Sequence, residues 1–473
     1  MRSLFLRFID FIKSPRLPFS IGEPLFRLSG MRINGGEKNL FTVKSIVVVL
    51  LDEIGDVVLT TPFLRQLRHN ARDAWITLIV KPAVYNLVEL CPYVNQVVTF
   101  DWHTRGHFRK IKLHWRALML SKRYLWHRRF SMAIVPRWDV DHYHATFVAY
   151  FSGAATRVCY SENVNALKKK LNRDFDELVT HVITESPLKH EVQRNLFVID
   201  YLGGSVCDDY LEMWLSSDDL EFAEKIMKEN GVDAETPLVT LGIGAGDTRR
   251  MWPIENFIEV ARRLEREQKA RIIIIAGASE KSLSWRLCQA LEKRVIDMSG
   301  NTSLRQACAL LRRSVLFIGN DSGPMHLAAA VGVPVIEISA FPLNAPPDGP
   351  NSPERFHPWG VPFLVLQPQT TLAPCTVTCK ATAAHCIKAV SVDDVLNAFM
   401  VLGSEPLPIV KTENTLVLGA FDMPARLKVK FLFRMIPSSG TGVIQSHLGA
   451  ALPRSMAERW LSHDVLVVDD FHP

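Results

Sequence analysis

The feature that most constrains the fold is a series of short apolar runs that alternate with segments of helical length. The run SIVVVLL at residues 45–51 is apolar after its first residue and rich in β-branched side chains, which is typical of a strand buried on both faces. Similar runs follow at residues 75–80, 96–100 and 131–136. Helix-length segments separate the runs, and the first of them, residues 57–70, has the apolar spacing of one helix. The pattern therefore predicts parallel strands joined by right-handed crossovers.

The same alternation begins again in the second half of the chain. Apolar runs and segments with helical periodicity alternate at residues 238–244, 253–268, 271–277, 282–293, 295–297, 303–313 and 315–320. Residues 163–204, between the two series, have a mostly polar and helical pattern, and a closing helix ends at two glycines. We therefore predict an α/β protein with two Rossmann-like domains that face a central cleft, where ligands bind beyond the carboxyl ends of the strands.

These patterns divide the chain into four parts. We expect a basic amphipathic extension at residues 1–44, a first domain at 45–215, a second domain at 216–403 and a C-terminal extension of unknown role at 404–473. Within the last part, residues 426–435 alternate like an edge strand or an amphipathic segment.

Composition limits the classes of function. The 473 residues are 48% hydrophobic and 22% charged, which supports sizeable cores and argues against wholesale disorder. The net charge of +6 suits acidic partners such as sugar nucleotides or an anionic lipid surface and does not require nucleic acid. The eight cysteines are mostly isolated, which favours a reducing compartment.

Two basic segments suggest membrane contact without requiring it. Residues 1–19 mix apolar and basic side chains and lack a small-residue cleavage site, so we expect no signal peptide but either an interfacial helix or a helix packed on the body. Residues 102–138 contain many Lys and Arg residues, four tryptophans and no acidic residue. This composition suits anionic head groups or a phosphorylated acceptor, and equally a solvated helix face. No apolar run reaches transmembrane length.

Three turns that follow predicted strands carry candidate functional residues. In the first, Asp56 follows Gly55, and its carboxylate suits either a general base or a helix N-cap. The second, residues 242–253, combines glycines with Arg249 and Arg250, which suits phosphate binding. In the third, small polar residues open a helix, whose free amide groups attract anions. Its candidate residues are Asp321, Ser322, Gly323 and His326.

The order and spacing of these turns resemble glycosyltransferase family 9, which includes the lipopolysaccharide heptosyltransferases. The matching stretches are DEIGDVVLTTPFLRQLR at 52–68, GIGAGDTRRMWPIENFIEVARRL at 242–264, GNDSGPMHLAAAVGVPVIEI at 319–338 and GPNSPERFHPWG at 349–360. Shorter echoes lie at 151–162 and 190–195, so the likeness covers roughly residues 45–400.

The resemblance implies a GT-B fold and an inverting transfer of a sugar, typically heptose from ADP-heptose, to a lipopolysaccharide-core or related glycan acceptor. It implies no cofactor or essential metal, the nucleotide sugar being a substrate. Independently of the resemblance, no recognised nucleic-acid-binding motif accompanies the basic segment, so we expect no nucleic-acid partner. It also implies a cytoplasmic enzyme at the inner face of the inner membrane, with peripheral membrane contact. The residues it implies are Asp56 as catalytic base, Gly55 and Thr60 on the acceptor side, and, for the donor, Gly244, Arg249, Arg250, Asp321, Ser322, Gly323, His326 and Arg355.

Some features depart from the family pattern. Leu50 stands where many relatives have Arg or Lys, and residues 339–348 lengthen a loop near the expected donor site. Two other functions fit the same fold, namely a sugar-nucleotide epimerase and a non-catalytic glycan- or nucleotide-binding scaffold.

The segment PCTVTCKATAAHC at residues 374–386 needs separate consideration. Cys375, Cys379 and Cys386, with His385, are suited to bind a metal, although their spacing is not a standard zinc pattern. Our preferred interpretation is a cluster of reduced structural thiols without metal, and metal binding is the alternative.

Overall fold

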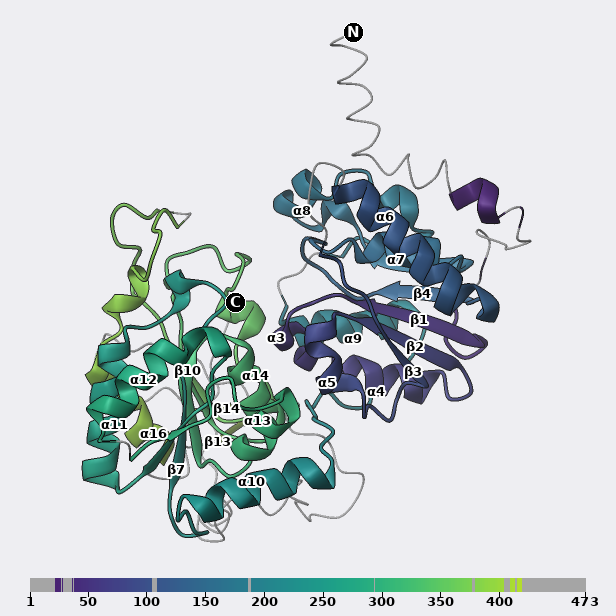
Figure 1. The fold of residues 1–473 in the computed structure, drawn as a ribbon. Helices are drawn as coiled ribbons and strands as arrows, with labels where there is room; N and C mark the ends of the chain where they lie inside the picture. The colour runs from purple at the N-terminus through teal and green to yellow at the C-terminus, as the bar shows by residue number, and fades with distance from the viewer. Residues whose placement is uncertain are drawn as a thin grey trace. The chain divides into compact units, whose positions relative to one another are not determined.

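The structure is a computed structural model of the chain. It describes residues 22–26, 28, 36, 38–103, 109–185, 189–292, 294–376, 379–403, 409–412 and 415–418. Contacts divide the chain into two units, Met1–Asp209 and Tyr210–Pro473 (Figure 1). The division falls close to the boundary predicted after residue 215.

The first unit is a parallel six-stranded sheet between two layers of helices. Its strands, in the order β3-β2-β1-β4-β5-β6, are Gln96–Thr99, Trp75–Val80, Ser45–Leu50, Met132–Val135, Thr156–Tyr160 and His181–Ile183. Helices α6 (Arg109–Leu120) and α7 (Ala145–Phe151) cover one face, and α4 (Thr61–Asn70) and α9 (Glu191–Tyr201) cover the other (Figure 1). Because β1 lies between both layers, all six of its residues are buried, as its continuous apolar run predicts.

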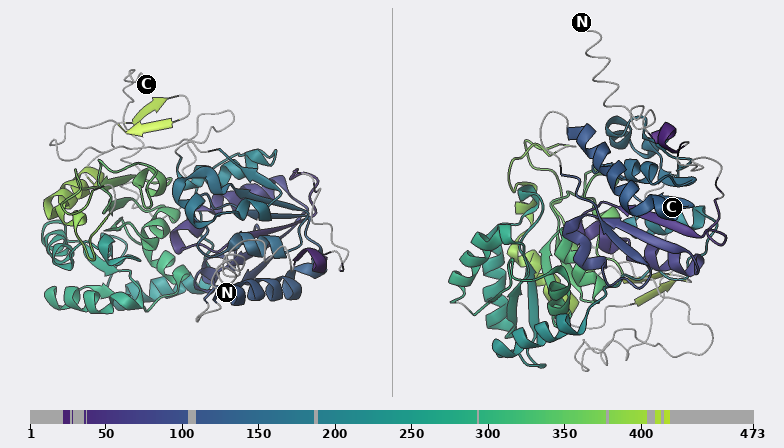
Figure 2. Two further views of the ribbon diagram at one scale, coloured as in Figure 1. Left: turned by 90° about the horizontal axis from the view of Figure 1, so that it is seen from above. Right: turned by 45° about the vertical axis from the view of Figure 1, so that its right-hand side comes forward.

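The second unit repeats this architecture. Its strands, in the order β12-β11-β10-β7-β8-β9, are Phe363–Leu366, Val335–Ile338, Leu316–Asn320, Leu238–Gly242, Arg271–Ile274 and Ile296–Asp297, and all pair in parallel. One helical layer contains α11 (Ile254–Gln268), α12 (Lys281–Ala290) and α16 (Val392–Gly403). The other contains α10 (Ser217–Glu229), α13 (Leu304–Leu311) and α14 (Gly323–Ala330) (Figure 1). A short antiparallel hairpin of β13 (Ile409–Thr412) and β14 (Thr415–Leu418) follows (Figure 2).

Both sheets have the strand order of a dinucleotide-binding fold, so the predicted α/β class with two Rossmann-like units is confirmed. In chain order within each unit, the strands lie 3-2-1-4-5-6. The order reverses between β1 and β4 in the first unit and between β7 and β10 in the second. Ligands of such sheets bind beyond the carboxyl ends of the strands at this switch point.

Several local predictions are wrong. The helix predicted over residues 57–70 is two helices, α3 (Ile54–Leu59) and α4, separated at Thr60. The mostly helical pattern predicted for residues 163–204 contains β6, a strand of three residues and therefore too short to show a period of two. The predictions for residues 1–19 and 426–435 lie outside the described residues. None of the helices in the described ranges is long and apolar enough to cross a membrane.

Candidate functional site

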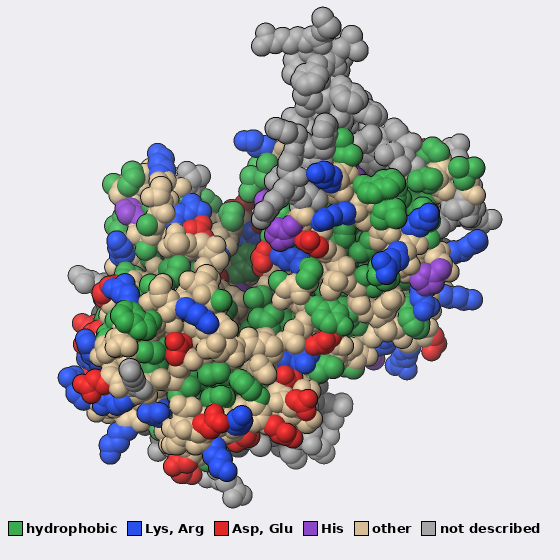
Figure 3. Space-filling view, in the orientation of Figure 1, with side chains coloured by type: hydrophobic (Ala, Val, Ile, Leu, Met, Phe, Trp, Pro, Cys, Tyr) green, Lys and Arg blue, Asp and Glu red, His purple; other side chains and the backbone are tan. Residues whose placement is uncertain are grey.

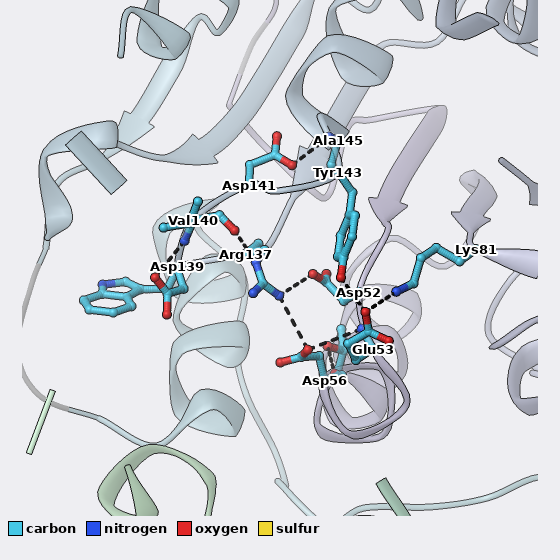
Figure 4. A network of polar contacts seen from close by, with 12 residues as sticks. Asp52, Glu53, Asp56, Lys81, Arg137, Asp139, Val140, Asp141, Tyr143 and Ala145 are labelled. Atoms are coloured by element: carbon cyan, nitrogen blue, oxygen red, sulfur yellow. Dashed lines mark hydrogen bonds and ion pairs between the residues drawn. The ribbon is translucent and has the colours of Figure 1, made fainter. Parts of the chain in front are cut away.

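The predicted site residues of the first unit lie at its switch point. Asp52, Glu53 and Asp56 follow the carboxyl end of β1, and Arg137 follows the end of the adjacent strand β4 (Figure 4). The two strand ends are neighbours because β1 and β4 pair in parallel, with Val48 beside Ile134. Residues far apart in sequence therefore form one polar network.

An ion pair between Asp52 and Arg137 forms the buried part of this network. The Arg137 Nη1 atom also lies 3.5 Å from Oδ2 of Asp56, and its Nε donates to the carbonyl of Val140 at 2.8 Å. Burial raises the pKa of Asp52 to about 6, against the opposing effect of the Arg137 charge. Arg137 thus holds two carboxylates, one buried and one accessible.

Replacing Arg137 should destabilise the first unit strongly. We expect Arg137→Met to lower the free energy of unfolding by about 3 kcal/mol, because the buried Asp52 carboxylate loses its countercharge. The double variant Arg137→Met, Asp52→Asn has no such charge and should recover part of the loss. Urea denaturation at neutral pH measures both, and equal losses in the two variants would contradict this role of the pair.

Asp56 occupies the first turn of α3 with its carboxylate accessible. Its side chain is 24% exposed, and Oδ2 accepts a hydrogen bond from the Glu53 amide at 3.3 Å. The Glu53 side chain completes a reciprocal capping box with the Asp56 amide. The N-cap of α3 is therefore Glu53, and Asp56, three residues later, joins the capping box without being the predicted N-cap itself. The capping contact fixes the carboxylate near Arg137 and leaves it open to solvent, as a general base requires.

A second chain of contacts links Glu53 to Lys81 and Tyr143. Lys81 Nζ lies 2.6 Å from Glu53 Oε1, which also accepts a hydrogen bond from the Tyr143 hydroxyl. The Lys81 ammonium lies 4.2 Å from the centre of the Tyr143 ring. Although burial raises it, the pKa of Glu53 remains below its usual value because Lys81 and Tyr143 donate hydrogen bonds to the carboxylate. The buried Lys81 ammonium thus contacts the carboxylate of Glu53, whose own backbone amide donates to Asp56.

The two acceptor-side residues differ in accessibility. Gly55 is partly exposed in the first turn of α3. Thr60 is buried. Its hydroxyl donates to the backbone carbonyl of Asp56 at 2.7 Å and accepts from the side-chain amide of Asn195 at 3.1 Å. Its hydroxyl therefore joins α3 to α9, which gives it a structural contact, while its role toward an acceptor stays a prediction.

In the second unit, Asn320 joins the two strands of the switch point. This buried residue ends β10. Its side-chain amide donates to the carbonyl of Ile243, just beyond β7, at 3.0 Å. Its side-chain oxygen accepts from the Trp252 amide at 2.9 Å. The turn at residues 242–253 is thereby fixed against the turn that begins at Asp321.

Arg250 projects between these two turns. Its Nη1 donates to Asp321 Oδ2 at 3.1 Å and to Asn351 Oδ1 at 3.2 Å. The side chain is 24% exposed, and its buried Nε has no hydrogen-bond partner among the described residues. The guanidinium therefore combines a fixed position with unused donor capacity, which suits an anionic ligand.

The neighbouring Arg249 has a different environment. It is 43% exposed and forms an ion pair with Asp247 in which Nε lies 2.8 Å from Oδ2. Hydrogen bonds from Arg249 lower the pKa of Asp247 to about 2. At Gly244, an added Cβ would meet the Glu280 side chain at 3.0 Å, so a side chain there would crowd the turn.

The amino terminus of α14 is left open by its own N-cap residue. Ser322 has extended backbone, and its hydroxyl donates back to the Asn320 carbonyl at 3.1 Å instead of capping the helix. Gly323, the first helical residue, adds no side chain in front of its own amide. Pro324 has no amide hydrogen, and the Met325 amide donates to the Ser322 carbonyl at 3.1 Å. This arrangement favours the predicted anion site over a simple helix cap.

Two buried titratable groups lie near Arg250. Burial, and to a lesser extent the charges of His357 and Arg250, lowers the pKa of His326 to about 3. Burial and the charge of Asp321 raise the pKa of Glu337, on β11, well above its usual value. The imidazole is therefore neutral at physiological pH, so it can form hydrogen bonds but cannot neutralise phosphate charge.

The burial of His326 predicts a specific loss of stability in acid. Its folded-state pKa is below the usual value of 6.5, so its contribution to stability is complete above that pH and is lost as the pH falls. Between pH 6.5 and 4.5 we expect wild type to lose about 2 kcal/mol more than His326→Gln, which cannot titrate. Urea denaturation across this range tests the difference, and parallel pH profiles for the two proteins would contradict it.

Arg355 lies in α15 (Pro353–Phe356) and is only 1% exposed. Its Nη1 lies 3.4 Å from the Gly349 carbonyl, and its guanidinium lies 4.8 Å from the centre of the Phe356 ring. These contacts hold the loop that carries Asn351. Its direct role toward the donor stays a prediction.

Sequence reasoning missed several members of both networks. Arg137 directly follows a predicted strand, and that position alone marks it as a switch-point candidate. Glu337 is the only charged residue of the apolar strand VIEI, a signal that also stands in the sequence. Lys81 likewise directly follows a predicted strand, at residues 75–80. Asn351 has no comparable signal, because only the folded chain brings it to Arg250.

Comparison with known proteins shows the family of the chain. The family model for glycosyltransferase family 9 (heptosyltransferase) matches residues 141–383. Lipopolysaccharide heptosyltransferase 3 of Escherichia coli (strain K12) is 26% identical over 298 residues, which cover 60% of this chain and 79% of the relative.

Two solved structures share the fold. A glycosyl transferase family 9 protein from Veillonella parvula superposes with a TM-score of 0.65 at 21% identity, covering 78% of this chain and 99% of that protein. The E. coli ADP-heptose lps heptosyltransferase II gives 0.55 at 17% identity, with coverages of 76% and 98%. The predicted GT-B fold class and the resemblance are thus confirmed, and the chain is a glycosyltransferase that belongs to family 9.

Proposed function

We propose that the enzyme transfers heptose from ADP-heptose to a lipopolysaccharide-core acceptor with inversion at the anomeric carbon. Support comes from family membership, from the names of its relatives and from the two switch-point networks. The first unit would bind the acceptor and the second the donor. Transfer requires neither cofactor nor catalytic metal in this proposal.

The chemistry needs a base beside the acceptor hydroxyl and positive charge beside the departing diphosphate. The Asp56 carboxylate would take the proton of the acceptor hydroxyl as that oxygen bonds to the anomeric carbon. The bond from this carbon to the diphosphate oxygen breaks at the same time, and negative charge develops on ADP. Arg250, the Gly323 amide and the positive end of the α14 helix dipole would stabilise that charge.

The placement of Asp56 is the observation that carries this proposal. Its carboxylate contacts Arg137, remains accessible and follows the first strand of the first unit. Arg250, the proposed contact for the donor, belongs to the second unit. An epimerase or a scaffold needs no acceptor-activating base there. We therefore favour glycosyl transfer over both alternatives.

A thermal-shift screen of nucleotide sugars tests the donor. Because a ligand that binds only the folded state raises stability, ADP-heptose should raise the melting temperature of the full chain more than UDP- or GDP-sugars do. A larger shift with UDP- or GDP-sugars would contradict the assignment of ADP-heptose. Conversion of a nucleotide sugar into its epimer without an acceptor would support the epimerase instead.

We further propose peripheral contact of the first unit with the inner face of the inner membrane. Lys112, Trp115, Arg116 and Met119 share the exposed side of α6, and Trp115 is 61% exposed. Figure 3 shows apolar and basic side chains intermingled on this part of the unit. Such a face suits anionic head groups. By contrast, Trp138 is buried beneath Arg194, so the tryptophans of residues 102–138 do not form a single surface.

A further inference from the structure

Three cysteines and a histidine of the second unit form a cluster that glycosyl transfer does not use. Cys375, Cys379, His385 and Cys386 lie between β12 and α16, where the short helical turn η8 (Cys386–Ala389) begins at the last of them. One ligand atom each from Cys375, His385 and Cys386 lies within 4.8 Å of the other two. None of these cysteines is in a disulfide bond, and Cys375 and Cys386 are buried.

The distances match the edges of a tetrahedral metal site. Bonds of about 2.3 Å to sulfur and about 2.0 Å to nitrogen place two sulfurs about 3.8 Å apart, and sulfur and nitrogen about 3.5 Å apart, around tetrahedral zinc. The Sγ atoms of Cys375 and Cys379 are 3.9 Å apart. His385 Nδ1 lies 3.6 Å from the Cys375 sulfur and 3.5 Å from the Cys386 sulfur. Cys375, His385 and Cys386 are thus prearranged around a common centre, and Cys379, beside Cys375, is the fourth candidate ligand.

Backbone hydrogen bonds to two of the sulfurs are a second, independent observation. The Lys380 amide donates to the Cys375 sulfur at 3.3 Å, and the Leu372 amide donates to the Cys386 sulfur at 3.5 Å. Outer hydrogen bonds of this kind orient ligands and stabilise thiolates at metal centres. Free thiols in an apolar core need no such donors.

We propose that Cys375, Cys379, Cys386 and His385 bind one structural Zn²⁺ ion. Three thiolates and one imidazole are a common closed ligand set for zinc, and binding would release the thiol protons to solvent. Carboxylates are absent from the set, which disfavours Mg²⁺ and Ca²⁺. This changes our preferred interpretation of the cysteines but leaves the transfer reaction metal-independent.

The site would stabilise the segment that borders the turn at residues 242–253. The side chains of Arg249 and Cys379 are in hydrogen-bond contact. Beyond the cluster, Trp252 Nε1 donates to the Val390 carbonyl at 2.9 Å. Zinc would therefore fasten residues 372–390 beside the Arg249–Trp252 side of that turn.

Metal analysis of the full chain tests the proposal. After growth with zinc and purification without chelating resins, we expect about one zinc per chain in wild type and in the control Cys288→Ser, whose thiol is in the same unit outside the cluster. Cys375→Ser and Cys386→Ser should lose the metal. Full zinc content in both variants, or iron at one equivalent in wild type, would overturn the assignment.

Cobalt substitution keeps the test independent of whether the variants fold. Metal-free wild-type protein titrated with Co²⁺ should develop the intense visible absorption of tetrahedral cobalt with thiolate ligands, and Zn²⁺ should abolish it. Weak absorption typical of octahedral cobalt would overturn the proposal. Neither readout depends on sugar transfer, so failure of this proposal is separate from failure of the proposed function.

Discussion

Asp56→Asn should abolish transfer while leaving donor binding intact. The amide keeps the size and the capping position of the carboxylate but cannot accept a proton from the acceptor hydroxyl. General bases of this kind contribute about 10²–10⁴-fold, so we expect kcat to fall by about three orders of magnitude. Steady-state kinetics with saturating donor and acceptor measure the loss, and calorimetry with ADP measures donor binding.

A second carboxylate of the first unit supplies the control for this result. Asp73→Asn changes an exposed carboxylate of the same unit and should leave kcat unchanged. Circular dichroism should show that both variants fold. If Asp56→Asn turned over at the wild-type rate, the role of Asp56 would be limited to its capping hydrogen bond with the Glu53 amide.

Arg250→Gln should weaken donor binding by about 100-fold. Hydrogen bonds to charged groups contribute about 1.5–3 kcal/mol each, and each 1.4 kcal/mol is a factor of ten in affinity. Glutamine keeps a polar side chain in the turn but loses the Nη1 atom that contacts Asp321, and it carries no charge for the diphosphate. We expect a raised KM for the donor and a raised Kd for ADP in calorimetry.

Arg249 provides a matched comparison, because it lies next to Arg250 in the same turn. Asp247 already neutralises it, and its side chain is more exposed, so Arg249→Gln should have a much smaller effect on ADP affinity. Equal losses for the two variants would show that the turn attracts ADP through net charge alone. An unchanged Kd for Arg250→Gln would remove this residue from the donor site.

The fold was largely predictable because buried parallel strands leave a strong signal. The apolar runs in SIVVVLL and RIIIIAG coincide with β1 and β8, and each of these strands pairs with a neighbour on both sides. Strand β6 was missed because three residues carry no period, and the break between α3 and α4 was missed because Thr60 interrupts no apolar spacing. Local geometry, not composition, decides these features.

The candidate site was predictable only where it follows a strand. Asp56, Arg250 and Asp321 all stand in turns after apolar runs, and the structure places each of them at a switch point. The burial of Arg355 and His326 was not visible in the sequence, because it depends on chain segments that pack over them. The same holds for the cysteine cluster, because only the folded chain brings ligand atoms of Cys375, His385 and Cys386 within 4.8 Å of one another.

The most direct test of the central claim is a mass measurement of the acceptor after reaction of the full chain with ADP-heptose. We predict that a lipopolysaccharide-core oligosaccharide gains one heptosyl residue for each ADP released, in the anomeric configuration opposite to that of the donor. Consumption of ADP-heptose with no gain in acceptor mass would contradict the account.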